Sequence, residues 1–313
     1  MYKNLIKIST IDMSREEWLA ERRKSLGGSD VAGILGMNEY SSPYSVWADK
    51  LGKLPEKEDN EAMRIGRDLE DYVAQRFTEK TGKKVRRENS IIRNPDYPYL
   101  HANVDRVVVG ENAVLECKTV SALSLQMYKN GEYPDRFYAQ CCEYLLVCGF
   151  SKAYLAVLVL GKEFLVFEIE RNEEELEALN EACKSFWKYV ETETPPTTDG
   201  ADSTTKAIST LYPTSNEDTV SLVSYEADLR EYMALSAQIK SLEALKEDKA
   251  NKVKAFLKEA GRGESNAYRV TWSTTERSTF DNKRFAKDNP GIDLSEYYKK
   301  STYRTFKVIE RKD

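Results

Sequence analysis

Histidine is nearly absent from this chain, since it occurs once among 313 residues, as His101. A Ser-His-Asp or Cys-His mechanism would have to be built on that one side chain, and a zinc site with several histidines is excluded. His101 precedes a run with strand character, where a structural or supporting role is expected. Hydrolytic chemistry in this protein should therefore depend on carboxylates, lysine and a hard metal ion.

Long apolar runs are also missing. No stretch approaches the roughly eighteen apolar residues of a transmembrane helix, and the N-terminus lacks the apolar region of a secretory signal.

The five cysteines form no C-x-x-C pair, and their odd number predicts reduced thiols in a cytoplasmic protein without a membrane partner. Cys141, Cys142 and Cys148 share one apolar stretch. They could ligate an iron–sulfur cluster, but adjacent cysteines on a helix point to different faces, which favours buried helix residues.

An excess of positive charge is lacking as well. The chain holds 47 basic and 52 acidic residues, a formal charge of −5, which argues against a protein that coats nucleic acid by bulk electrostatics. A nuclease is still compatible, because metal-binding carboxylates add negative charge. The distribution is uneven: the first 220 residues carry −9, and residues 221–313 carry +4.

Residues 1–190 mix helical and strand patterns. Helices are expected over 14–25, where Ser14 and Glu17 form a capping box, from residue 60 up to a stop at Gly82, over 134–148 with a stop at Gly149, and over 172–191. Strand-rich hairpins are expected around residues 110–112 and 161–162. This pattern predicts an α/β or α+β domain.

The rest of the chain has a different composition. Residues 191–220 are rich in Pro, Thr, Ser and Asp and predict a linker with one short helix around Thr204–Leu211. Residues 221–260 lack Gly and Pro and predict a long helix or helical hairpin. Their seven-residue apolar pattern is interrupted by Lys246 and Lys249, which argues against a full coiled coil. Strands over 267–278 and 302–310, around a short helix, complete a C-terminal helical and β region, 221–313.

The first hairpin carries the strongest chemical signal. Glu116 and Lys118 are two residues apart in a strand, so they share a face. If the turn is centred on residues 110 and 111, Asp105 lies opposite Glu116, with β-carbons about 5 Å apart. A three-residue loop would shift this pairing. Burying Glu116 and Lys118 costs several kcal/mol unless they are paired or metal-bound. A salt-bridged strand face is the alternative.

This trio suits phosphodiester hydrolysis. Two carboxylates can hold Mg²⁺ or Mn²⁺, and the backbone carbonyl of Cys117, between the two side chains, is a natural further ligand. The metal would lower the pKa of a bound water, and Lys118 would orient that water and offset charge on the phosphate.

The pattern D-(x)n-E-x-K resembles the core of the PD-(D/E)xK nuclease superfamily, although Pro98 stands seven residues before Asp105. Its surroundings resemble the phage lambda exonuclease and YqaJ-like viral recombinase family through residues 14–190. The segments that carry this resemblance are EWLAERRKSLGGSDVAGILGMN, GRDLEDYVAQRF, YLHANVDRVV, AVLECKT and FYAQCCEYLLVCG. The implied fold is a restriction-endonuclease-like core, a mixed central β-sheet flanked by helices.

The resemblance also implies roles for single residues. Asp105 and Glu116 would bind one or two metal ions, and Lys118 would assist the attacking water. Glu70 would lie beside the metal directly or through water, and Gln140 would brace the active site or the substrate backbone. Alternatively, both could be surface residues of charged helices.

Two further residues are implied to bind DNA. Arg22, seven residues before Ser29, would contact a phosphate, preferably the 5′-terminal one, with Ser29 beside it. Arg23 could serve in place of Arg22, and Ser29 could be only a helix cap.

The implied activity is Mg²⁺-dependent 5′-to-3′ exonuclease action on linear double-stranded DNA. The product would be a 3′ single strand for a single-strand annealing protein. The resemblance implies a phage or prophage protein that forms a homo-oligomeric ring. From their composition, residues 221–313 are expected to serve assembly, DNA handling or partner docking. The alternatives are an endonuclease or repair nuclease on the same core, or a catalytically inactive DNA-binding or assembly module.

Overall fold

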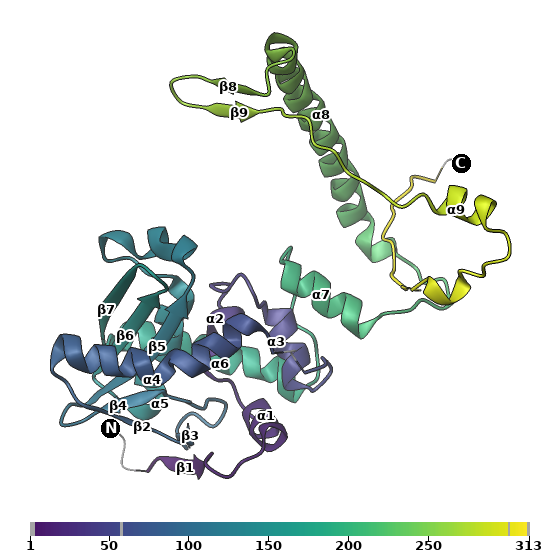
Figure 1. Ribbon diagram of the computed structural model, residues 1–313. Coiled ribbons are helices and arrows are strands. Elements are labelled where there is room, and N and C mark those ends of the chain that lie inside the picture. Colours follow the sequence, from purple (N-terminus) through teal and green to yellow (C-terminus); the bar gives the residue numbers. More distant parts are fainter. Residues whose placement is uncertain (1–3, 57–58, 300, 312–313) are drawn as a thin grey trace. The chain divides into compact units, whose positions relative to one another are not determined.

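The computed structural model describes residues 4–56, 59–299 and 301–311 (Figure 1). The chain divides into two compact units, Met1–Tyr212 and Pro213–Asp313. The first unit extends beyond the predicted boundary at residue 190, because helix α7 (Asp202–Leu211) packs on α3 (Pro43–Lys50). The Thr204 hydroxyl donates to Ser42 Oγ at 2.7 Å, and Ala207 is buried. The range 191–220 is therefore not a linker throughout.

A five-stranded mixed sheet forms the centre of the first unit, as predicted. Its order is β2 (Val85–Arg87), β4 (Arg106–Val108), β5 (Ala113–Val120), β6 (Lys152–Val159) and β7 (Glu163–Glu170). Only the β5–β6 pair is parallel. Between these two strands the chain passes through η1 (Ala122–Gly131) and helix α5 (Asp135–Cys148), because a parallel connection needs a crossover.

A second, two-stranded sheet pairs β1 (Ile6–Ser9) with β3 (Ser90–Arg93). The sequence did not predict β1, and residues 84–94, KVRRENSIIRN, have the local character of a single strand. That run instead supplies β2 to the central sheet and β3 to the small one. The partner of β3 lies more than 80 positions away, so no local pattern could reveal the split.

Helices cover both faces of the central sheet. Helix α4 (Glu61–Thr81) lies across one face (Figure 1). There Val73 and Phe77 pack against Leu115 and Tyr154. The other face carries the larger core, to which α2 (Gly28–Ile34), α3, α5 and α6 (Glu173–Glu191) contribute. Side chains of β5 alternate between these layers, since Leu115 packs with α4 and Val114 with the α5 side. Glu116 follows Val114 onto the α5 side.

Most helix ends follow local signals. Helix α1 (Arg15–Arg23) has the predicted capping box of Ser14 and Glu17, and α4 ends at Gly82 with a positive φ. Helix α5 likewise ends at Gly149. Cys141, Cys142 and Cys148 are buried side chains of α5, and the thiols are free.

The second unit consists of η2 (Val223–Tyr225), α8 (Glu226–Leu257), β8 (Arg262–Glu264), β9 (Arg269–Thr271), α9 (Asn282–Asp288) and η3 (Ser295–Tyr297). Residues 221–260 thus contain one continuous long helix rather than a hairpin. The strand predicted over 267–278 is reduced to β9, which pairs with β8. The strand predicted over 302–310 is wrong, because the described residues 301–311 form no ladder with another segment.

Within the described part of the chain, no helix is both long and apolar enough to cross a membrane.

Candidate active site

The β4–β5 hairpin sets the position of the predicted carboxylates. Arg106 pairs with Leu115 and Val107 with Val114, which is the register expected for a turn centred on residues 110 and 111. Gly110 adopts a φ of 80°, which favours glycine. One step beyond the ladder, the Cys117 N–H donates to Asp105 Oδ2 at 2.8 Å. Continued by one step, the register of this ladder places Asp105 opposite Glu116, as the sequence predicts.

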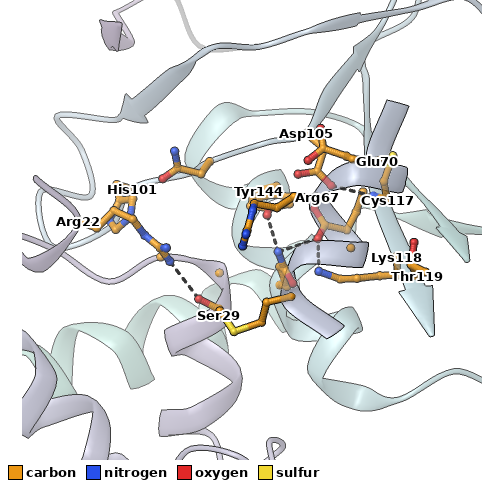
Figure 2. A pocket seen from close by; sticks show the side chains of 17 residues that line it. Arg22, Ser29, Arg67, Glu70, His101, Asp105, Cys117, Lys118, Thr119 and Tyr144 are labelled. Atoms are coloured by element: carbon orange, nitrogen blue, oxygen red, sulfur yellow. Dashed lines mark hydrogen bonds and ion pairs between the residues drawn. The ribbon is translucent and has the colours of Figure 1, made fainter. Parts of the chain in front are cut away.

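One cavity of about 450 Å³ is lined by every residue predicted for the site: Arg22, Ser29, Glu70, Asp105, Glu116, Cys117, Lys118 and Gln140. Figure 2 shows Asp105, Glu70, Cys117 and Lys118 on one side of it, and Arg22, His101 and Ser29 on the other. Arg23 is not part of this lining, and its guanidinium lies 3.9 Å from Asp49. Of the two candidate arginines, the geometry favours Arg22.

Glu116 is the most deeply buried acid of this lining, with 1% of its surface exposed. Its Oε1 accepts from Gln140 Nε2 at 2.8 Å and makes an ion pair with Lys118 Nζ. Its Oε2 is buried and finds no hydrogen-bond partner among the described residues. A buried carboxylate oxygen without a donor is costly, unless a cation takes the place of the donor.

Asp105 has the Cys117 N–H as a donor, but its carboxyl is buried close to that of Glu116. Burial, followed by the nearby Glu116 carboxylate, raises its pKa well above the usual range. Burial acts to lower the pKa of Lys118, but Glu116 and Asp105 outweigh it, and the pKa of this lysine is raised. Lys118 is thus held protonated, with its Nζ 5.1 Å from the Phe137 ring centroid. One ammonium compensates for only part of the charge of two close carboxylates.

Gln140 connects this side of the cavity to helix α5. Its amide nitrogen donates both to Glu116 and to the Tyr144 hydroxyl, at 2.6 Å for the latter. It is therefore not a free surface side chain. A β-carbon on Gly28 would lie 2.8 Å from Gln140 Cγ and 3.2 Å from its carbonyl oxygen. Glycine at residue 28 thus allows α2 and α5 to approach closely.

Glu70 reaches the cavity from α4 and is tied to Arg106, which the sequence reasoning missed. Arg106 is 4% exposed and makes ion pairs with Glu70 and Asp71, while also donating to the Asp105 carbonyl at 2.7 Å. A charged residue next to Asp105 in an otherwise apolar strand was the available signal. Arg106 joins the strand that carries Asp105 to the helix that carries Glu70.

The opposite side of the cavity holds cationic and neutral donors. The Arg22 guanidinium donates to Ser29 Oγ at 3.2 Å and lies 4.4 Å from the Trp18 ring centroid. His101 is fully buried, and its Nδ1 lies 3.0 Å from Ser25 Oγ. Burial, followed by the charge of Lys50, lowers the pKa of His101 to about 3, so this ring is neutral.

The residues suited to a metal ion are Asp105, Glu116 and the carbonyl of Cys117. No cluster of three His, Cys, Asp or Glu side chains stands ready for a metal ion anywhere in the described ranges. The partnerless Oε2 of Glu116 and the crowded Asp105 carboxyl nevertheless fit a hard cation.

Comparison with known proteins places the chain. The family model of the YqaJ-like viral recombinase domain matches residues 17–151. An uncharacterized protein, YqaJ, from Bacillus subtilis (strain 168) is 37% identical over 306 residues, covering 96% of this chain and 95% of that protein. The chain belongs to the YqaJ-like viral recombinase family. The matched range includes every predicted site residue.

Two solved structures show weaker similarity. An alkaline exonuclease, LHK-Exo, from Laribacter hongkongensis is 20% identical, with a TM-score of 0.49 over 57% of this chain and 93% of that one. A phage-related exonuclease from Haemophilus somnus 129PT is 11% identical, with a TM-score of 0.41 over 54% and 96%. Because the identity is this low, these two structures do not assign roles to single residues, and such roles must be argued from the geometry of the cavity.

Proposed function

We propose that this protein is a metal-dependent exonuclease that degrades one strand of linear double-stranded DNA from 5′ to 3′ and leaves a 3′ single strand. The observation that carries the proposal is the buried Glu116 carboxylate, which has one oxygen without a donor and lies beside Asp105 and Lys118 in one cavity. Membership in a viral recombinase family supports a substrate that takes part in DNA recombination.

Asp105, Glu116 and the Cys117 carbonyl would hold one or two Mg²⁺ ions, and Mn²⁺ would substitute. Glu70 would lie beside them directly or through water, held by Arg106. When bound, the metal lowers the pKa of a coordinated water and offsets charge on the phosphate. The two carboxylates require this compensation, because Lys118 supplies a single positive charge.

Lys118 and Gln140 would complete the chemical side of the cavity. The Lys118 ammonium contacts Glu116 Oε1, from where its remaining protons can orient a water and stabilise a phosphate oxygen. Gln140 fixes the same Glu116 oxygen through one hydrogen bond, and Tyr144 anchors Gln140 in turn. This arrangement limits the rotation of the Glu116 carboxylate.

Arg22 and Ser29 would bind the 5′-terminal phosphate of the DNA. The planar guanidinium can donate two parallel hydrogen bonds to a phosphate, and the Ser29 hydroxyl lies within hydrogen-bond distance of it. The Arg22 Nε is buried and partnerless among the residues that the structure describes, so it has a donor to offer. This side of the cavity would select the end of the strand.

The 3′ strand would be passed to a single-strand annealing protein for recombination. We propose that the protein acts as a homo-oligomeric ring around its DNA, in the cytoplasm of a bacterial host that carries the phage or prophage.

Digestion of end-labelled linear duplex tests this function. The wild type should release nucleotides from the 5′ strand in Mg²⁺ and stop when a chelator is added. Glu116→Gln and Lys118→Ala should release nucleotides far more slowly than the wild type under the same conditions. Chelator-sensitive cleavage retained by both variants would contradict the site assignment.

A covalently closed circular duplex separates the alternatives. An exonuclease should leave the circle intact, whereas an endonuclease or repair nuclease on the same core would cut it. A catalytically inactive DNA-binding module would cut neither substrate while still shifting linear duplex in a gel.

A further inference from the structure

Helix α8 of the second unit carries an apolar stripe that its own unit leaves open. None of its 32 residues is buried. Eight of its large apolar side chains are 39–86% exposed, among them Tyr232, Leu235, Ile239, Leu242 and Phe256. Tyr232 touches Phe306, with ring centroids 5.5 Å apart, but remains 44% exposed. An apolar surface of this length marks an interaction site.

The stripe follows a seven-residue repeat with a defined centre and defined ends. Tyr232 and Ile239 occupy the first core position of the repeat, and Leu235 and Leu242 occupy the second. Beyond this apolar centre the same two positions hold Lys246 and Lys249. On the N-terminal side, the position equivalent to Leu235 one repeat earlier holds Asp228.

Charge on α8 is separated along its length. Residues 226–239 contain three acidic and one basic side chain, and residues 240–257 contain three acidic and five basic ones. The two halves therefore carry −2 and +2. A parallel pair of such helices would place like charges together, whereas an antiparallel pair would place opposite charges together.

We propose that α8 pairs with α8 of a second copy of this chain, antiparallel, with facing core residues whose numbers add to 474. In this register Leu235 faces Ile239 of the second copy, and Tyr232 faces its Leu242. Asp228 then faces Lys246, and neither of these two forms an ion pair within the described residues of its own chain. Shifting the register by one repeat would press Lys246 against Leu235.

The apolar and charge pattern of α8 fits a second copy of the same helix, because a two-fold axis between the copies makes each favourable contact occur twice. The same Asp228–Lys246 and Leu235–Ile239 pairs then occur twice, as an isologous interface requires. The paired segment, residues 225–249, is about 37 Å long at 1.5 Å per residue.

Disulfide cross-linking of the full-length protein tests the pairing. Ser236 is not a core residue, but it follows Leu235 at the edge of the core, next to the two-fold axis. In the proposed register the two copies of Ser236 therefore lie close together across the interface, whereas Ala237 points outward. Mild oxidation should therefore convert Ser236→Cys into a covalent dimer, well above the background from the five native cysteines in the wild type. Ala237→Cys is the matched control. Equal cross-linking of the two variants would overturn the proposal.

Charge reversal tests the register in the same Ser236→Cys protein. Asp228→Lys or Lys246→Asp should each lower cross-linking about tenfold, since each changes two symmetric contacts, and the double reversal should restore it. Lys240→Asp, on the outer face, should have little effect. Failure of the double reversal to restore cross-linking would overturn the antiparallel arrangement.

Discussion

The two sides of the cavity differ in charge and in the elements that build them. The strand side carries Asp105 and Glu116, two crowded carboxylates with one lysine. The helical side carries Arg22, Ser29 and a neutral His101. Under the proposed function, the carboxylate side would carry out hydrolysis and the Arg22 side would recognise the end of a strand. Substitutions on the two sides should therefore affect different measurements.

The largest effect is expected from Glu116→Gln. This change keeps the side-chain size but removes the charge that would hold the metal, so kcat should fall about a thousandfold. Thermal unfolding should show little loss of stability, because the new amide oxygen can still accept from Gln140 and Lys118 keeps Asp105 as an opposite charge. Steady-state digestion and a melting curve check both parts. A large fall in Tm would show that Glu116 supports the fold rather than the reaction.

Lys118→Ala should lower kcat about a hundredfold with little change in KM, since in the proposed mechanism the ammonium would act on the reacting water and phosphate. Lys162→Ala, at the turn between β6 and β7, is the matched surface control. A change confined to KM would instead place Lys118 among the groups that bind DNA.

His101 predicts a pH dependence of stability. Its pKa is about 3 in the folded protein and about 6.5 when unfolded, so below pH 6.5 the unfolded chain binds more protons. The stabilising contribution of His101 to the free energy of unfolding is present above pH 6.5 and declines by about 2 kcal/mol between pH 7 and pH 5. Denaturant titrations at several pH values give the free energy of unfolding. Between pH 7 and pH 5 this free energy should fall more steeply with pH in the wild type than in His101→Gln. The same pH dependence in both proteins would show that the folded ring titrates normally.

The smallest effect is expected from Arg22→Ala. The variant should lose about tenfold in its preference for 5′-phosphorylated over 5′-hydroxyl ends, while the rate on 5′-hydroxyl ends is retained. Arg23→Ala is the control, because Arg23 does not line the cavity. An equal loss of digestion rate on 5′-phosphorylated and 5′-hydroxyl ends would contradict a separate role for the Arg22 side of the cavity in recognising the end.

The sequence predicted those features of the fold that depend on residues close together in the chain. The caps of α1, α4 and α5 and the register of the β4–β5 hairpin follow from residues close in sequence. Pairings between distant segments were missed, among them β1 with β3 and the packing of α7 on α3. The strand expected over 302–310 failed because propensity alone does not supply a partner strand.

The candidate site divides in the same way. Spacing alone brought Asp105, Glu116 and Lys118 together, since one hairpin carries all three. Glu70, Gln140 and Arg22 lie on three different helices, and only the family resemblance connected them to the hairpin. Arg106 was missed because its role depends on Glu70 and Asp71, which are more than 30 positions away.

Binding of Mn²⁺ to the protein without DNA tests the central claim most directly. Calorimetric titration of the wild type should show a site that Glu116→Gln weakens at least about tenfold. Glu79→Gln, a surface acid on α4, should leave the affinity unchanged. Equal affinity in the wild type and Glu116→Gln would contradict the assignment of the Asp105 and Glu116 pair as the metal site.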